Sequence, residues 1–238
     1  MQQKMNTLSD LNIYVAHVKK GYEDREKHVL DTMKKLVLKF RWILDGDIPD
    51  LNETEMLKYF SSDLLKINAG SSCTIKHLKM LEQMVNDNVP FALLLEDDFI
   101  PAPQFKKVLI EILNHVSELP PSFFISLENT GFKTLPEDSV QVGKYLFEAN
   151  KTRCAAAYIL DRKAAETILK FTYEKKCSEI IDWHYNTIAK NKLIKIFWCC
   201  PAIVEQGSHN GKFSSALSNR KSNVIRRVSF AIQKWIKK

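Results

Sequence analysis

The segment PFALLLEDDFIPAP, residues 90–103, is the part of the chain that most constrains its fold. Its apolar residues at 91–95 stand in an unbroken run, which indicates a strand covered on both faces, as in an α/β sheet. Three carboxylates follow at Glu96, Asp97 and Asp98. Adjacent carboxylates repel one another and resist leaving water, so their place at the end of a core strand calls for a partner of opposite charge.

Strand-like and helix-like segments alternate over the rest of the chain. We expect further buried strands near 12–17, 41–46, 122–127 and 193–200, and two strands between 140 and 161 that turn near Asn150 and Lys151. Helical patterns cover 23–40, 71–87, 104–116, 161–176 and a segment from about Asp182, with Ser71 or Ser72 and Asp161 as N-caps. This alternation predicts an α/β fold with a mostly parallel central sheet flanked by helices. We expect one domain over 1–210 and a separate tail over 211–238.

The cysteines indicate reduced thiols. There are five of them, an odd number without a Cys-x-x-Cys spacing: Cys73, Cys154, Cys177, Cys199 and Cys200. The first residues show no basic start followed by a long apolar run, and no apolar stretch reaches the roughly 18 residues of a membrane span. We therefore expect a cytoplasmic protein that is neither secreted nor membrane-spanning.

The net charge of +7 belongs to the end of the chain. After Glu205 there are eight basic residues and no acidic one, whereas residues 1–205 carry 27 basic and 28 acidic side chains. Within 222–238, apolar and basic residues lie on opposite sides of a helical wheel, and Trp235 is on the apolar side. Such a helix indicates a peripheral contact with an anionic membrane surface, unless its apolar side packs on the body. Because the excess of basic residues is confined to the tail after residue 210, we do not expect nucleic acid as a partner.

The carboxylates at 96–98 come at the carboxyl end of their strand, which is the edge where open α/β sheets bind ligands. A divalent cation would offset their charge, and carboxylate oxygens favour Mg²⁺ or Mn²⁺ over zinc. A metal with open coordination positions suits a nucleoside diphosphate. One alternative is that the acids cap the helix after Pro103 or lie solvated in a loop. Another is a metal-dependent phosphohydrolase or nucleotidyl enzyme that activates water with the same carboxylates.

Several segments resemble glycosyltransferase family 25, which includes bacterial lipooligosaccharide β-galactosyltransferases and collagen galactosyltransferases. LLLEDDFIP is similar to the family's acidic motif, NIYVAHVKKGYEDREKHV to its opening strand and SSCTIKHLKML to its Ser-His helix. RCAAAYILDRKAAETIL, IIDW and PAIVEQGS follow in the family's order, so the resemblance spans residues 12 to about 210. The sequence departs from the pattern at Lys76, where a small residue is usual, and at Glu128, Asn129 and Thr130, which replace a more apolar strand end.

The resemblance implies a GT-A-like nucleotide-sugar-binding fold and an inverting transfer of a hexose, above all galactose, from a UDP-sugar. The implied acceptor is a lipooligosaccharide or another surface glycan. Because the tail would hold the enzyme at the inner face of the cytoplasmic membrane, we expect this acceptor to be lipid-linked. We expect Mn²⁺ or Mg²⁺ as cofactor, bound by Glu96, Asp98 and His209. Of these, Asp98 is the first candidate for a direct bond to the metal. The donor-binding residues that we expect are Arg25, His77, Asp97, Gln206 and Ser208.

Inversion also needs a general base that removes the proton of the attacking hydroxyl. Asp182 is the first candidate because it follows an apolar pair and precedes two aromatic residues, a setting that can pack a sugar ring; Glu128 is the reserve. Plainer interpretations stay open: Asp182 as a helix N-cap, Arg25 as a solvated residue of a first helical turn, His77 as a buried polar side chain, and residues 206–209 as a polar connector.

Overall fold

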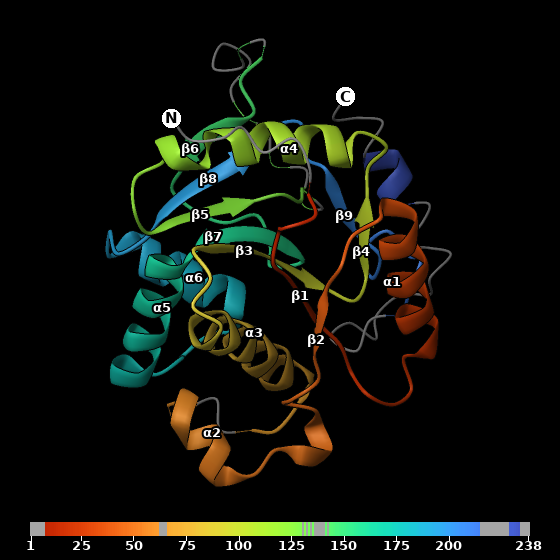
Figure 1. Ribbon diagram of the computed structural model, residues 1–238. Coiled ribbons are helices and arrows are strands. Elements are labelled where there is room, and N and C mark those ends of the chain that lie inside the picture. Colours follow the sequence, from red (N-terminus) through yellow and green to blue (C-terminus); the bar gives the residue numbers. More distant parts are fainter. Residues whose placement is uncertain are drawn as a thin grey trace.

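A seven-stranded sheet forms the centre of the protein in the computed structural model (Figure 1). The structure describes residues 8–61, 66–129, 131, 133, 135, 141, 143–214 and 229–233. Within these residues the sheet order is β2-β1-β3-β7-β5-β8-β6, with the bounds Arg41–Ile43, Ile13–Ala16, Phe91–Glu96, Ala157–Asp161, Phe123–Ser126, Lys195–Cys199 and Leu146–Ala149. A smaller sheet pairs β4 (Phe99–Pro101) antiparallel with β9 (Val204–Gln206).

Most strands of the large sheet run in one direction. The pairs β1–β2, β1–β3 and β5–β8 are parallel. Strand β7 lies antiparallel between β3 and β5, and β6 is antiparallel at the β8 edge. Strands β1, β2, β3, β5 and β8 therefore share one direction, and only β7 and β6 of this sheet oppose it. The predicted α/β class with a mostly parallel sheet is confirmed.

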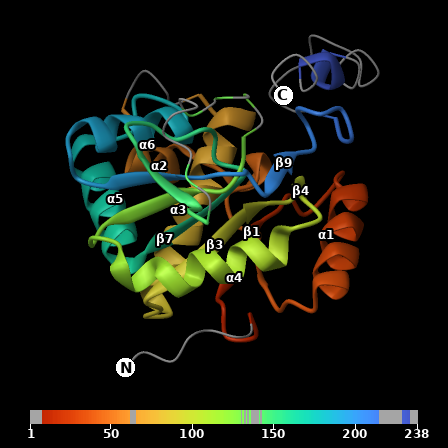
Figure 2. The ribbon, with the colours of Figure 1, turned by 90° about the horizontal axis from the view of Figure 1, so that it is seen from above.

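Helices cover both faces of the large sheet. Helices α1 (Glu23–Leu36) and α4 (Phe105–His115) lie against one face, whereas α3 (Ala69–Asn86), α5 (Arg162–Lys175) and α6 (Ile181–Lys190) lie against the other (Figure 1). The view from above shows α4 crossing β3 and α1 beside β4 (Figure 2). Shorter elements are the 3-10 turns η1 (Ile48–Asp50) and η3 (Val116–Glu118) and helix α2 (Glu53–Tyr59).

The apolar run of β3 serves both layers. Leu93 and Leu95 pack in the core under α1 and α4, while Ala92 and Leu94 pack in the core under α3, α5 and α6. This explains the unbroken apolar pattern, because each face of the strand meets a hydrophobic layer. The strand ends at Glu96, and β4 pairs with β9 rather than with a strand of the large sheet. The strand predicted at 91–95 is thus confirmed, and the apolar residues after the carboxylates form a second strand that belongs to a different sheet.

The helix boundaries confirm one predicted cap and correct another. Asp161 caps α5 as expected, because its carboxylate accepts a hydrogen bond from the Ala164 N–H at 2.9 Å. Helix α3 begins earlier than expected and is capped by Asn68, whose side chain accepts from Gly70 and Ser71 while the Ser71 hydroxyl accepts from the Asn68 N–H. The cap predicted at Ser71 or Ser72 is wrong because this reciprocal capping box starts the helix one turn earlier. Helix α1, predicted to reach residue 40, ends at Leu36.

The predicted C-terminal helix falls mostly outside the described residues. Residues 229–233 are helical, and Ile232 is exposed there. The remainder of 222–238 lies beyond what the structure describes, so the amphipathic helix and the boundary at 210 stay predictions. Within the described ranges, none of the helices combines the length and the apolar character that a membrane crossing requires.

The buried His184 gives the fold a pH-dependent stability. Its Nε2–H donates to the Thr172 hydroxyl at 2.8 Å, and that hydroxyl donates to the Ile168 carbonyl. Burial lowers the pKa of His184 to about 4. Between pH 6.5 and 4 the unfolded chain therefore binds a proton that the folded chain resists, so stability is fully present above 6.5 and is lost as the pH falls. We expect a loss of about 3 kcal/mol in the free energy of unfolding from this group.

His184→Gln should remove this component, since glutamine can still donate to Thr172 but does not titrate. The measurement is the free energy of unfolding in urea at pH 7, 5.5 and 4.5. The contribution of His184 is the difference between the pH dependence of the wild type and that of the variant. His115→Gln, at an exposed histidine, is the matched control and should keep the wild-type slope. Parallel curves for His184→Gln and the wild type would contradict the assignment.

Candidate functional site

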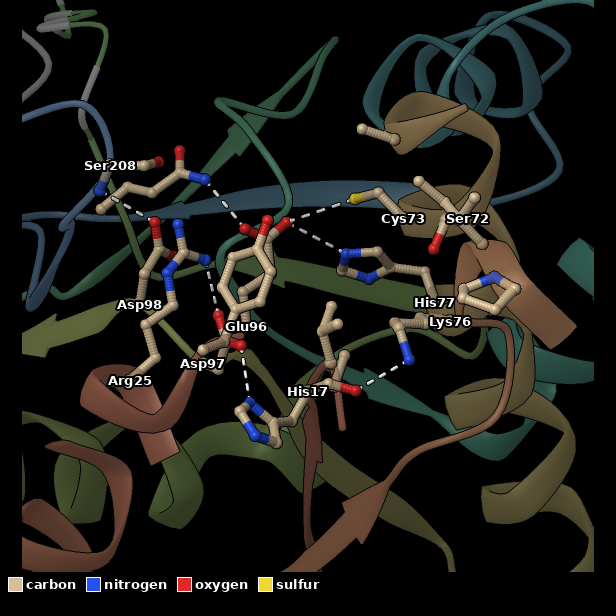
Figure 3. A pocket seen from close by; sticks show the side chains of 17 residues that line it. His17, Arg25, Ser72, Cys73, Lys76, His77, Glu96, Asp97, Asp98 and Ser208 are labelled. Carbon is tan, nitrogen blue, oxygen red and sulfur yellow. Dashed lines mark hydrogen bonds and ion pairs between the residues drawn. The ribbon is translucent and has the colours of Figure 1, made fainter. Parts of the chain in front are cut away.

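A cavity of about 260 Å³ opens at the carboxyl edge of β1 and β3. From β1 the chain passes through α1 to β2 on one side, and then through α3 to β3 on the other side, so the strand order reverses here. Open α/β sheets bind ligands at such a switch point. The cavity is lined by the loop after β1, η1, the first half of α3, the end of β3 and the loop after β9 (Figure 3).

Asp97 is fixed by two cationic or polar partners. His17, which follows β1 directly, donates through Nδ1–H to one carboxylate oxygen at 2.8 Å, and Arg25 donates to the other at 2.7 Å. Asp97 is 4% exposed, so this ion pair is largely shielded from water. Burial acts to lower the pKa of Arg25, but the neighbouring carboxylates outweigh it and raise that pKa, which keeps the guanidinium charged. Arg25 is therefore an inward-facing charge partner and not a solvated residue of the first helical turn.

Glu96 is held by side chains from α3 and from the end of β9. One carboxylate oxygen accepts from the His77 Nε2–H at 3.1 Å, and the other accepts from the Gln206 amide at 2.8 Å. Behind His77, Nδ1 meets the Tyr158 hydroxyl at 2.9 Å, and the Tyr158 and Tyr185 hydroxyls are 2.9 Å apart. A continuous polar chain thus runs through the apolar core from α6 to the cavity. Figure 3 shows His77 and Cys73 of α3 facing Glu96.

Asp98 differs from its two neighbours. It is 1% exposed, and its Oδ2 accepts from the Ser208 N–H at 2.9 Å. Its Oδ1 is buried with no hydrogen-bond partner among the described residues. Burial and then the charge of Glu96 raise the pKa of Asp98 to about 7, although Arg25 acts in the opposite direction. A buried carboxylate oxygen without a partner fits a hard divalent cation, because such an ion would replace the missing hydrogen bond and offset the repulsion.

The loop after β9 can reach Asp98 because residue 207 is glycine. Its N–H donates to the Asp98 carbonyl at 2.8 Å. A Cβ at this position would lie 2.5 Å from the Phe213 ring and 2.9 Å from the Asp98 carbonyl oxygen, closer than real contacts allow. Arg25 also donates to the Ser214 carbonyl, so the loop is tied to α1 as well as to the carboxylates. Gln206 and Ser208 are therefore positioned parts of the site and not a loose polar connector.

Lys76 supports the wall of the cavity from within. Its ammonium lies 2.6 Å from the Asp47 carboxylate and donates to the His17 carbonyl at 2.7 Å. Burial lowers the pKa of Lys76, while Asp47 acts against that shift. The residue that departs from the family pattern thus clamps the end of β1 to the loop before η1.

Three predicted site residues lie outside the lining of the cavity. Asp182 is in the first turn of α6, and Ile180 rather than Asp182 is the N-cap, so the plain capping interpretation does not hold. Burial raises the pKa of Asp182, and the charge of Glu96 acts in the same direction. Glu128 is fully buried and forms an isolated bridge with Val204. His209 is exposed, and the structure does not bring it to Asp98 among the lining residues.

The structure brings together Arg25, His77, Glu96, Asp97, Asp98, Gln206 and Ser208, all predicted from the sequence. It adds His17 and Cys73, which we did not predict as site residues. A signal for His17 existed, because it follows the first strand at the same sheet edge as the carboxylates. Cys73 could be found from its spacing of four residues from His77, which puts both on one side of α3.

The chain is similar to known proteins in sequence and in structure. A family model described as glycosyltransferase family 25 (LPS biosynthesis protein) matches residues 11–184. Among solved structures, a glycosyltransferase involved in the glycosylation of the major capsid of PBCV-1 is similar at 10% identity, with 76% of each chain covered and a TM-score of 0.40. An apo UDP-glucose pyrophosphorylase is similar at 13% identity, with 79% of this chain and 72% of that chain covered and a TM-score of 0.35. No match was found among curated proteins.

Proposed function

The chain belongs to glycosyltransferase family 25, and from this premise we propose that it transfers galactose from UDP-galactose, with inversion, to a hydroxyl group of a saccharide. A glycosyltransferase needs a nucleotide-sugar donor and a glycan acceptor. The observation that carries the proposal for the donor is Asp98, whose buried Oδ1 has no partner among the described residues and which lines the cavity beside Arg25.

We propose Asp98 as the protein ligand of Mn²⁺ or Mg²⁺. His17 and Arg25 hold both oxygens of Asp97, and His77 and Gln206 engage both oxygens of Glu96, so these two residues supply negative charge near the hard cation rather than its ligand atoms. When bound, the cation would act as a Lewis acid on the diphosphate and stabilise the charge that develops on the leaving UDP.

Arg25 and the loop after β9 are suited to the diphosphate end of the donor. The guanidinium is fixed by Asp97 and lines the cavity, so it can bind phosphate oxygens without first losing side-chain freedom. Ser208 closes the same end beside Asp98, and Gln206 reaches Glu96, which His77 orients from α3.

Asp182 is the general base of this proposal. Burial raises its pKa, which strengthens it as a proton acceptor, and a half-buried position leaves it within reach of an acceptor. Its carboxylate would take the proton of the acceptor hydroxyl while that oxygen attacks the anomeric carbon and the bond to the diphosphate breaks. Glu128 is less suited, because a fully buried carboxylate offers no surface to a saccharide.

Asp98→Asn should reduce Mn²⁺-dependent release of UDP from UDP-galactose by about 100-fold or more, since the charge that holds the cation is lost. The variant should fold at least as well as the wild type, because one member of a repelling pair becomes neutral. Thermal stabilisation by UDP-galactose with Mn²⁺ reports donor binding independently of turnover. Asp31→Asn, at an exposed carboxylate of α1, is the control. Wild-type turnover by Asp98→Asn would remove Asp98 from the proposal.

Asp182→Asn should keep donor binding and slow transfer to a soluble saccharide by about 100-fold, the usual order of a general-base contribution. The assay compares UDP release with and without acceptor, because a phosphohydrolase would release UDP equally fast in both. Glu179→Gln is the matched control, since this nearby carboxylate bonds to Thr187. Normal transfer by Asp182→Asn would assign the base to another residue.

For the acceptor we propose a lipid-linked saccharide at the inner face of the cytoplasmic membrane, with residues 222–238 as the membrane contact. The support is the sequence pattern of the tail together with its exclusive positive charge. Deletion of 222–238 should abolish sedimentation with vesicles containing anionic lipid and preserve transfer to a soluble acceptor. Neutral vesicles serve as the control, and unchanged binding of the truncated protein to anionic vesicles would refute the membrane contact.

A further inference from the structure

Three different metal-binding groups converge at the α3 wall of the cavity. The Cys73 thiol lies 3.9 Å and the His77 Nε2 lies 3.1 Å from the same oxygen, Glu96 Oε1. All three ligand atoms are within 4.8 Å of one another. His77 is fully buried, whereas Cys73 and Glu96 are half-buried, so the group can be reached from the cavity that all three line.

The local structure keeps these atoms together. Cys73 and His77 are four residues apart on α3, which puts their side chains on one side of the helix. Two ligands at this spacing on one helix are the arrangement by which His-x-x-x-His helices bind zinc. Glu96 comes from the end of β3 and completes the group from the opposite side.

The spacing of the atoms suits a tetrahedral ion. Zinc bonds of about 2.3 Å to sulfur and about 2.0–2.1 Å to nitrogen and oxygen put neighbouring ligand atoms roughly 3.3–3.6 Å apart. The two separations from Glu96 Oε1, 3.1 Å to His77 Nε2 and 3.9 Å to Cys73 Sγ, lie within half an ångström of that range, and the Cys73 and His77 atoms are within 4.8 Å of each other. Small side-chain rotations at Cys73 and Glu96 would therefore form the site without movement of α3 or β3.

Outer contacts orient two of the three ligands. The Tyr158 hydroxyl lies 2.9 Å from His77 Nδ1, and the Gln206 amide holds the second oxygen of Glu96 at 2.8 Å. A histidine that binds metal through Nε2 carries its proton on Nδ1 and donates it to a neighbouring oxygen. Tyr158 can accept that proton because its own hydroxyl can turn towards Tyr185.

We propose that Cys73, His77 and Glu96 bind Zn²⁺ at a site separate from the hard-cation site at Asp98. Zinc displaces the thiol proton of Cys73, which leaves to solvent. Zinc also takes the Nε2 position of His77, so the single N–H proton of the neutral ring moves from Nε2 to Nδ1. One thiolate and one carboxylate balance the two positive charges of the ion. The fourth position faces the cavity and takes water or a small ligand. A thiolate favours zinc over Mn²⁺ or Mg²⁺, which prefer oxygen.

Cobalt(II) is the probe, because it occupies tetrahedral zinc sites and absorbs in the near ultraviolet when a thiolate binds it. Titration of the full chain with Co²⁺ should give this band, and stoichiometric Zn²⁺ should remove it. Cys73→Ser should lose the band and bind Zn²⁺ at least about 100-fold more weakly, because loss of an outer-shell partner alone costs about 10- to 100-fold. Cys200→Ser, at a half-buried cysteine outside the cavity lining, is the matched control and should keep it.

Tyr158→Phe is the second variant. It should keep the thiolate band and weaken Zn²⁺ binding by about 10- to 100-fold, an effect that a purely structural role of Cys73 would not produce. Melting temperatures without metal check that each variant is folded. No band in the wild type, or an equal band in Cys73→Ser, overturns the site.

Asp98→Asn separates this inference from the proposed function. The variant should keep the cobalt band and lose Mn²⁺-dependent donor binding. If the wild type shows Mn²⁺-dependent transfer without a cobalt band, the zinc site alone fails. If the band is present without any transfer, the proposed function alone fails.

Discussion

The ion pair between Arg25 and Asp97 is the interaction on which the site depends. Three consecutive carboxylates end β3, and two of them are buried. Burial of such a group is costly unless opposite charge and hydrogen bonds accompany it. Arg25 and His17 supply both to Asp97, and His77 and Gln206 engage Glu96. Because Asp97 and Glu96 have partners, Asp98 is the carboxylate that still lacks a hydrogen bond to one oxygen among the described residues. A bound cation could supply that interaction.

The layered α/β fold could be predicted from the sequence because the strands and helices of each layer have recognisable local sequence patterns. The apolar run of β3, the helical spacing of α4 and the Asp161 cap depend on residues close together in the chain. The turn that separates β3 from β4 was not predictable in the same way, because β4 is a strand only through its pairing with β9, about a hundred residues later. The Asn68 cap was missed because two other polar residues nearby offered the same short-range signal.

Site residues could be predicted where a sequence motif at the end of a strand places them at the sheet edge. Residues that are placed by contacts between distant segments were harder to predict. Glu96, Asp97 and Asp98 follow a strand, so their edge follows from strand direction. His17 and Cys73 gain their meaning only from what faces them across the cavity. Asp182 and His209 were predicted from their sequence motifs, but neither lines the cavity. Helix α6 sets the direction of the Asp182 side chain, and the turn after β9 sets that of His209.

The hydrogen-bonded chain from Tyr185 through Tyr158 and His77 to Glu96 has a mechanical consequence. Tyr185 lies one turn after Asp182 on α6, so the helix that carries the proposed base is joined to the carboxylate at the donor wall. Tilting α6 would leave several buried hydroxyl and imidazole groups without partners, at a cost of about 1–3 kcal/mol for each. The proposed base and the carboxylate wall of the cavity are therefore held in fixed positions relative to each other before any ligand binds, so little orientational entropy would be lost on binding.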